Sequence, residues 1–224
     1  MHDSGYAYGS WGIAVTMIAV SLFFLFRFIP MHTKLGKRSG GALVAFFVAL
    51  FAEMYGFPLT IYLLSHFFGV RIPLDHISGH LLGDLITWTG LGNGWAVVMI
   101  ASNLLIIAGI WIISAGWERV YQSEGGLVTD GPYQYVRQPQ YAGIFLITLG
   151  FMIQWPTLAT LILWPFVIWM YVRLARREER DVLAEHPDQY RAYMDRTPMF
   201  VPRLFGARQN NTQHTSDFEG SRHA

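Results

Sequence analysis

The chain has 224 residues, of which 53% are hydrophobic and 14% charged, a composition too apolar for an ordinary soluble domain. Its formal net charge of +1 gives no electrostatic reason to expect a nucleic-acid partner. Cysteine is absent, which excludes disulfides, thiolate metal ligands and a cysteine nucleophile.

Three long apolar runs occupy the first half of the chain. The first, Trp11–Ile29, matches the ~20 residues that one bilayer crossing requires. The second, Gly41–Gly69, is longer and contains Glu53 and Pro58. Because proline removes a helical hydrogen bond, we expect this span to kink near Pro58. The third run, Trp95–Ala115, predicts another crossing.

A segment of mixed polarity, Ile72–Gly92, separates the second run from the third, and it predicts a short interfacial or re-entrant helix on the outer side. His76, His80 and Asp84 share a helical face here, at a spacing that metal ligands also use. Two glycines weaken a helix in this segment, so we favour interfacial side chains over a metal site.

Two shorter apolar runs follow the third span. Tyr141–Gln154 is short for a full crossing, and Thr157–Leu174 follows it after a Trp-Pro turn. Together these runs predict a helical hairpin. The expected fold is all-α: a multi-pass transmembrane helical bundle of about five spans, with the C-terminal helical hairpin and a cytoplasmic C-terminal helix.

Basic residues are distributed unevenly between the loops, and their placement predicts the orientation. They follow the first, third and fifth runs: Lys34, Lys37 and Arg38; Arg119 and Arg137; Arg173, Arg176, Arg177 and Arg180. The segment between the second and third runs has Arg71 alone. Because basic loops stay in the cytoplasm, we expect the N-terminus outside and the C-terminus in the cytoplasm.

The polar residues on the predicted cytoplasmic side form dense clusters. Gly131–Tyr141 is rich in Tyr, Gln and Arg and is stiffened by two prolines, and Arg176–Arg180 lies below the hairpin. A rigid polar loop at the mouth of a helix can hold a polar cofactor beside a lipid-embedded substrate. The same residue types also serve as interfacial anchors, so the composition of these clusters leaves both interpretations open.

The polar segment follows one extended pattern of residues: Gly131, Pro132, Tyr133, Val136, Arg137, Pro139, Tyr141, Gly143, then Glu178, Glu179, Leu183, Tyr190 and Tyr193. This pattern resembles the isoprenylcysteine carboxyl methyltransferase family, and the related phospholipid methyltransferases share much of it. The resemblance covers residues 124–203. Several positions at fixed spacing make it far more specific than one short motif.

The resemblance implies S-adenosylmethionine as the cofactor, bound between the loop before the hairpin and the acidic start of the C-terminal helix. Carried over by position, the cofactor-binding residues are Gln122, Leu127, Val128, Tyr133, Gln138, Pro139, Tyr141 and Glu179. The family's histidine is Gln138 here, and glutamine can hydrogen-bond a cofactor but cannot act as a general base. The family's substrate-side arginine falls near Ala175, which leaves Arg173 or Arg176 to replace it.

We therefore expect an integral membrane methyltransferase that depends on S-adenosylmethionine and acts on a lipophilic substrate: a prenylcysteine-like carboxylate, a phospholipid amine or a small lipophilic molecule. The substrate would enter from the bilayer, among membrane lipids, with no nucleic-acid partner. Arg137 and Arg173 are candidate catalytic residues that would hold an anionic group. Glu53, an ionisable residue within a span, is a candidate lining residue of the substrate cavity.

Two alternatives stay open at this point. One is a non-catalytic lipid-binding or transport-related membrane protein of the same superfamily, and the other is a membrane sterol reductase that uses NADPH. In either case the chain divides into three parts: N-terminal transmembrane helices over 1–115, a cofactor-binding and catalytic region that includes the hairpin over 116–205, and a tail over 206–224. The tail is poor in apolar residues, so we expect it to be disordered.

Overall fold

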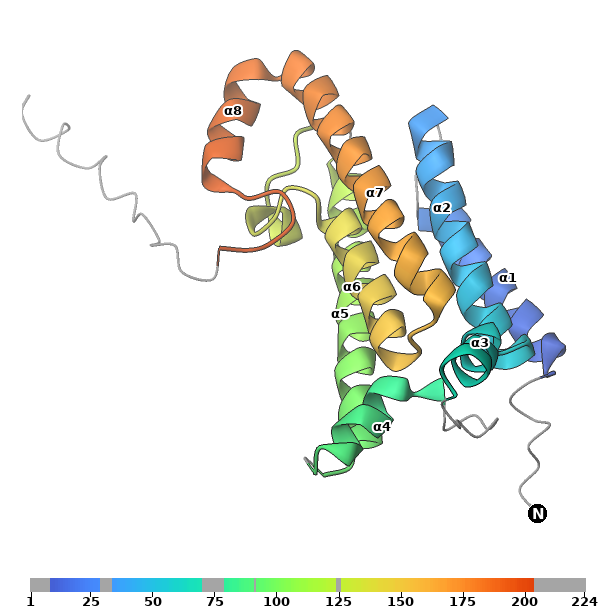
Figure 1. Cartoon of the computed structure of the whole chain (residues 1–224). Helices are drawn as coiled ribbons and strands as arrows, with labels where there is room; N and C mark the ends of the chain where they lie inside the picture. Colours follow the sequence, from blue (N-terminus) through green and yellow to red (C-terminus); the bar gives the residue numbers. More distant parts are fainter. Residues whose placement is uncertain (1–8, 29–33, 70–78, 91, 124–125, 204–224) are drawn as a thin grey trace, which may run out of the picture.

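The structure, a computed structural model, describes residues 9–28, 34–69, 79–90, 92–123 and 126–203. All regular secondary structure in these ranges is helical, which confirms the predicted all-α fold (Figure 1). His76, the start of the predicted interfacial segment and the predicted disordered tail lie outside the described residues.

The second predicted span is two helices rather than one. α1 (Trp11–Phe28) is followed by α2 (Lys34–Phe51), which continues through a short π-helical turn, η1 (Ala52–Gly56). The chain then breaks at Pro58, and α3 (Leu59–Phe68) turns sharply away from α2 (Figure 1). The predicted kink near Pro58 is confirmed, because proline cannot donate a helical hydrogen bond and disfavours a helical conformation in the residue before it.

Glu53 stabilises this break. Its side chain is buried within η1, and Oε2 accepts the backbone N–H of Thr60 at 2.9 Å. The first N–H groups of a helix have no partner inside the helix, and a negative group beside them is favourable. The carboxylate of Glu53 therefore caps the N-terminus of α3.

Among the described residues, three helical segments are long and apolar enough to cross a membrane: Gly36–Gly56, Gly94–Gln122 and Leu158–Glu185. The second and third of these are α5 (Gly94–Gln122) and α7 (Leu158–Glu185). The first and fourth predicted spans correspond to α1, with 18 residues, and to α6 (Pro139–Gln154), with 16. At 1.5 Å per residue α6 is roughly 24 Å long, which is less than the hydrocarbon thickness of a bilayer.

The predicted helical hairpin is confirmed as α6 followed by α7. Its turn is fixed by a capping box in which Thr157 Oγ1 accepts the N–H of Thr160 at 3.0 Å and the N–H of Thr157 donates to Thr160 Oγ1 at 3.2 Å. α7 continues well past Leu174, the predicted end of its apolar run, because the charged residues that follow are good helix formers.

Gly79 and His80, just before α4 (Leu81–Trp88), contact the turn of the hairpin, whereas α4 itself packs on α5. His80 is buried between Trp95 and Trp155, and its Nδ1 lies 2.7 Å from the carbonyl oxygen of Gln154 at the end of α6. Burial lowers the pKa of His80, so its ring is neutral at pH 7 and donates from Nδ1 to this carbonyl. The last turn of α6 is therefore closed by a side chain from another element.

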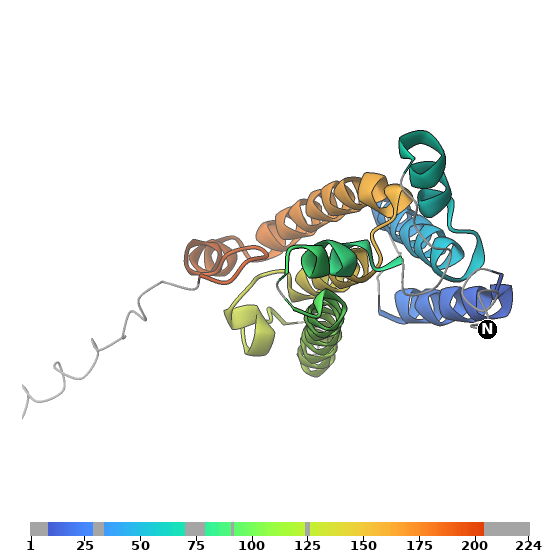
Figure 2. The same ribbon diagram turned by 60° about the horizontal axis from the view of Figure 1, so that its bottom comes forward.

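Glycines allow α6 to lie directly along α5, as Figure 2 shows from one end of the bundle. A Cβ atom on Gly109 would lie 2.6 Å from the carbonyl oxygen of Gly143, and one on Gly150 would lie 2.8 Å from that of Ser102. Two helix backbones approach this closely only where the residue at the point of contact is small, such as glycine. α7 packs mainly against α2 instead, and α1 packs on the other side of α2.

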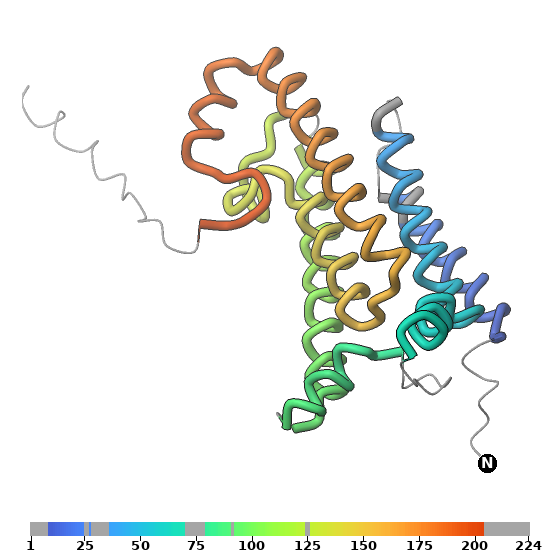
Figure 3. Tube along the Cα trace, viewed as in Figure 1, coloured from blue at the N-terminus to red at the C-terminus, as the bar shows by residue number. Residues whose placement is uncertain are grey.

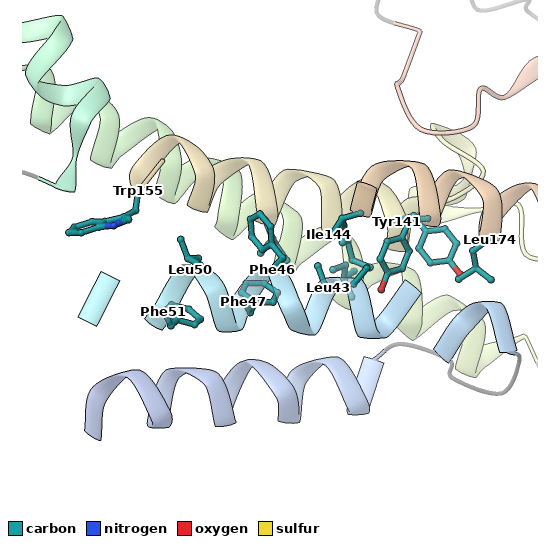
Figure 4. Close-up of a cluster of buried hydrophobic side chains, with 14 of the residues drawn as sticks. Leu43, Phe46, Phe47, Leu50, Phe51, Tyr141, Ile144, Trp155 and Leu174 are labelled. Carbon is teal, nitrogen blue, oxygen red and sulfur yellow. The ribbon is translucent and has the colours of Figure 1, made fainter. Parts of the chain in front are cut away.

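The hydrophobic core lies where α2 meets the hairpin, as the close-up in Figure 4 shows. Phe47 stacks on Phe51 with ring centroids 6.0 Å apart and meets the edge of Phe151 at 5.7 Å. Leu43 and Ile144 extend the same cluster toward the end of the bundle opposite the hairpin turn. This contact sets the distance between α2 and the hairpin.

Beyond α7 the chain reverses. α8 (Pro187–Arg196) runs back toward the short 3₁₀ turn η3 (Gly131–Gln134), as the trace in Figure 3 makes clear. The loop before α6, the end of α7 and the segment around α8 thus meet at one end of the bundle.

Candidate functional site

A buried ion pair organises this end of the bundle. Nε of Arg137 donates to Oε1 of Glu179 at 2.7 Å, and Nη2 donates to Oε2 at 3.3 Å. The two side chains are only 11% and 8% exposed, so water screens their attraction little. Burial opposes the charged form of Arg137, but the hydrogen bond and charge of Glu179 outweigh it and raise the pKa of Arg137. The pair closes the hairpin at the end opposite its turn.

Arg137 also holds the segment that contains α8. Its Nη1 donates to the carbonyl oxygens of Met194, at 3.1 Å, and Thr197, at 2.5 Å. The backbone N–H groups of Arg137 and Gln138 donate to the carbonyl oxygens of residues 198–199 at 2.9 and 3.0 Å. One guanidinium therefore joins the loop before α6 to α7 and to the end of α8.

The turn before this loop is held by tyrosines. Gly131 has a φ of +58°, a conformation that favours glycine, and it opens the Gly-Pro-Tyr turn. The hydroxyl of Tyr193 donates to the carbonyl oxygen of Tyr133 at 2.6 Å, and the amide of Gln140 donates to the hydroxyl of Tyr133. The position of the Tyr133 ring is thus fixed from both α8 and α6.

The phenols around this turn are neutral at physiological pH. Burial raises the pKa of Tyr133 to about 12, although the hydrogen bond from Gln140 opposes the increase. Burial also raises the pKa of Tyr190 and that of Tyr193; the charge of Glu179 adds to the first shift and neighbouring phenols add to the second, while Arg137 opposes both. These side chains can therefore serve as hydrogen-bond donors or as aromatic faces, but not as bases at pH 7.

Glu178 and Glu179 face different partners although they are neighbours in the sequence. Glu179 is held by Arg137, whereas Glu178 Oε1 accepts the hydroxyl of Tyr141 at 2.7 Å. Successive residues of an α-helix point about 100° apart, which separates the two carboxylates. Glu178 is the one that lines the large cavity of the molecule.

This cavity has a volume of about 680 Å³ and two chemically different ends. Its polar end lies near η3, the end of α7 and α8, and its lining includes Tyr133, Gln138, Tyr141, Glu178, His186 and Tyr190. Its apolar end extends between the membrane helices, where its lining includes Met17, Phe24, Phe47, Ile110, Ile113 and Phe151. A cavity of this kind can hold a polar ligand and an apolar ligand side by side.

The cavity opens between α1 and α5. Val20 on α1 is 59% exposed and Ile110 on α5 is 42% exposed, and both line the cavity. At the polar end these two helices are connected by Arg27, whose Nη1 donates to the hydroxyl of Tyr121 at 3.1 Å. The opening therefore lies on the apolar side of this Arg27–Tyr121 bridge, at the level of the region that lipid chains occupy.

Most of the residues predicted to bind the cofactor do line the cavity. They are Leu127, Val128, Tyr133, Gln138 and Tyr141, and the predicted catalytic residue Arg137 lines it as well. Pro139 is buried at the start of α6, next to these residues. Gln122 is exposed at the end of α5, where its amide donates to Glu118 at 3.3 Å.

Three other predicted residues are not among those that line the cavity. Glu179 is bound to Arg137, and Glu53 caps α3 in the part of the bundle near the hairpin turn. Arg173 lies on an exposed face of α7, with its guanidinium 5.6 Å from the centre of the Trp169 ring. The predicted catalytic roles of Arg173 and Glu53 have no contact with the cavity to support them.

Glu178, the carboxylate that does line the cavity, belongs to the sequence pattern but is not among the residues predicted to bind the cofactor. Helical spacing gives a partial signal: it directs Glu178 toward the bundle interior but does not separate it from Glu179, which lies four residues after the buried Ala175. Glu178 lies four residues after Leu174 and seven after Tyr171, both of which are buried, so it continues their face of α7 toward the bundle interior. Tyr190 and Tyr193 were recognised as part of the pattern but not as lining residues.

Comparison with known proteins gives a family and several relatives. The phospholipid methyltransferase family matches residues 93–187. A methanethiol S-methyltransferase of Crocosphaera subtropica is 29% identical over 127 residues, which are 55% of this chain and 49% of that protein, so the chain spans about half of that relative's length. A nickel-cobalt-cadmium resistance protein, NccN, of Alcaligenes xylosoxydans is 32% identical over 174 residues, 72% of this chain and 78% of its own. A protein-S-isoprenylcysteine O-methyltransferase of Schizosaccharomyces pombe is 32% identical over 79 residues, 35% and 34% of the two chains.

Replacing one member of the buried ion pair is expected to destabilise the fold. Glu179→Gln leaves the guanidinium of Arg137 buried without a counter-charge, which should lower the free energy of unfolding by about 3–5 kcal/mol. Asp130→Asn is the matched control, since it breaks the Arg119–Asp130 pair, whose side chains are 45% and 66% exposed, and should cost less than about 1 kcal/mol. Thermal unfolding in detergent, followed by circular dichroism, compares the two. An equal loss of stability in the two variants would contradict a special role for the buried ion pair.

Proposed function

This chain belongs to the phospholipid methyltransferase family, and from this premise we propose that it is a membrane methyltransferase, which transfers a methyl group from S-adenosylmethionine to a lipophilic acceptor. The observation that carries the proposal is the two-ended cavity, which joins phenols, amides and carboxylates to an apolar region that opens between membrane helices. A polar donor and an apolar acceptor need adjoining compartments of this kind to come into line.

The charges at the polar end suit a cationic ligand. Glu178 and Glu185 line it, whereas the charge of Arg137 is compensated by Glu179. S-adenosylmethionine carries a sulfonium and an ammonium group, which carboxylates and aromatic faces attract. We propose that the residues that hold it are Leu127, Val128, Tyr133, Gln138, Tyr141 and Glu178.

One residue of the cavity wall has an unpaired polar group. Trp117 lines the cavity, and its buried indole N–H has no hydrogen-bond partner among the residues that the structure describes. A buried donor without a partner is destabilising, so a ligand that accepts from it removes a penalty. Trp117 lies on α5 between Ile113 and Ser123, which also line the cavity, and thus near the junction of its two ends. We assign it to the polar head of the acceptor.

The proposed reaction asks little acid–base chemistry of the chain. When bound, S-adenosylmethionine supplies an electrophilic methyl group, and the protein aligns the acceptor and excludes water. Gln138 cannot take up a proton. A thiolate or carboxylate acceptor is already ionised and suits the site without a base. A neutral amine would need a proton acceptor, for which the His186 imidazole is present at the polar end.

Calorimetry on the purified protein tests the cofactor. We expect S-adenosylmethionine to bind and NADPH to give no heat. Glu178→Gln should weaken the binding of S-adenosylmethionine by at least about tenfold, because a charge-assisted hydrogen bond contributes about 1.5–3 kcal/mol. Asp188→Asn removes an exposed carboxylate from α8 and should bind as the wild type does. Binding of NADPH alone, or unchanged affinity in Glu178→Gln, would rule out this assignment.

The apolar end is tested separately by narrowing it. Ile110→Trp places a larger side chain at the opening of the cavity and should lower kcat/KM for a lipophilic acceptor at least about tenfold, while the affinity for S-adenosylmethionine stays the same. Ile107→Trp is the control, since Ile107 lies on the same helix, is 63% exposed and does not line the cavity. Comparable loss in both variants would show that the opening has no specific role.

We also propose that the polar end of the cavity faces the cytoplasm, with the N-terminus outside, because the arginine-rich end of α7 lies there. The chain has no cysteine, so single cysteines can be labelled without background. A membrane-impermeant maleimide applied to intact cells should label Thr89→Cys, before α5, and should label Asp188→Cys, on α8, only after the cells are opened. Labelling in the reverse order would contradict the orientation.

A further inference from the structure

One exposed face of α7 combines aromatic and basic side chains. Phe166, Trp169, Arg173, Arg176 and Arg180 follow one another at intervals of three or four residues, which places them on a single stripe of the helix. All five are exposed. The aromatic residues belong to the apolar part of α7, and the arginines follow where the helix leaves that part. The stripe therefore changes from apolar to cationic along the direction in which α7 leaves the membrane.

The basic part of the stripe borders a hollow between α7 and α8. This hollow has a volume of about 500 Å³, and its lining includes Trp169, Arg173, Arg176, Arg180, Leu183 and Met194. Glu179 forms part of its wall. Because Glu179 is bound to Arg137, which lines the large cavity, the ion pair separates the two spaces. The hollow is thus outside the site described above.

The arginines of the hollow have no carboxylate partner in the described part of the chain. The ion pairs found there are Arg119–Asp130 and Arg137–Glu179. Glu179 gives both oxygens to Arg137, so its charge is compensated, and Glu178 turns toward the large cavity. Arg173 is held over the face of Trp169 at 5.6 Å, which keeps its guanidinium at the edge of the apolar surface. The hollow therefore has a net positive charge that the fold leaves uncompensated.

We propose that this hollow binds the phosphate headgroup of an anionic phospholipid, with the acyl chains along Trp169 and Phe166. Guanidinium groups offer paired N–H donors that match phosphate oxygens. Basic residues at the end of a membrane helix attract the anionic lipids of the adjacent leaflet. The exposed aromatic rings next to the arginines suit an amphiphile and give a free phosphate ion nothing to contact, and this favours a lipid as the occupant.

Lipid retention by the full-length protein tests the hollow. The protein is placed in nanodiscs of equimolar phosphatidylcholine and phosphatidylglycerol. After the protein is released from the nanodiscs, the lipids that stay bound to it are counted by native mass spectrometry. Wild-type protein should retain phosphatidylglycerol in excess. The triple variant Arg173→Gln, Arg176→Gln, Arg180→Gln should lose at least about tenfold of this preference, since each basic residue near an anionic leaflet contributes about fivefold. Unchanged preference would overturn the proposal.

Two further variants separate a specific site from general charge and from loss of folding. Arg177→Gln, Arg191→Gln, Arg196→Gln removes the same charge from exposed positions of α7 and α8 outside the hollow, and should keep the preference. Leu183→Trp fills the hollow but leaves every arginine in place, and this variant should lose the preference for phosphatidylglycerol. Equal loss in both arginine triples, retention by Leu183→Trp, or displacement of the lipid by millimolar inorganic phosphate would each overturn the proposal.

Discussion

The ion pair between Arg137 and Glu179 holds together three segments that are far apart in the sequence. Arg137 lies in the loop before α6, Glu179 lies in the second half of α7, and the carbonyl groups that Arg137 also contacts lie at the end of α8. A buried charge is tolerated only when its partners are in place, so each segment can adopt few positions once the pair has formed. The polar end of the cavity is built on this constraint.

The same pair determines what the two neighbouring carboxylates of α7 can do. Because Glu179 is committed to Arg137, Glu178 is left to face the cavity with Tyr141 as its donor. The ion pair then forms the partition between a cavity with a carboxylate-lined polar end and an outer hollow lined by arginines. Two sites of opposite charge can lie on either side of one helix because the residue between them is neutralised.

Much of this arrangement could be predicted from the sequence. The hairpin, the break near Pro58 and the meeting of the Tyr133–Tyr141 loop with the acidic part of α7 follow from apolar runs, from proline and from the motif pattern. The direction of single side chains could not be predicted, because a motif fixes a position along the chain but not its face in the assembled bundle. For this reason the sequence did not predict that Glu178, rather than its neighbour, lines the cavity, or that Arg173 faces outward.

The closure of α6 by His80 affects how the protein fits its surroundings. α6 is shorter than a bilayer's apolar layer, and a helix of that length normally forces the surrounding lipid to thin or the helix ends to become hydrated. Here the neutral imidazole of His80 takes the final carbonyl of α6, and Trp155 covers it. The last carbonyl group of α6 therefore finds its hydrogen-bond partner inside the protein and does not need water at that end of the helix.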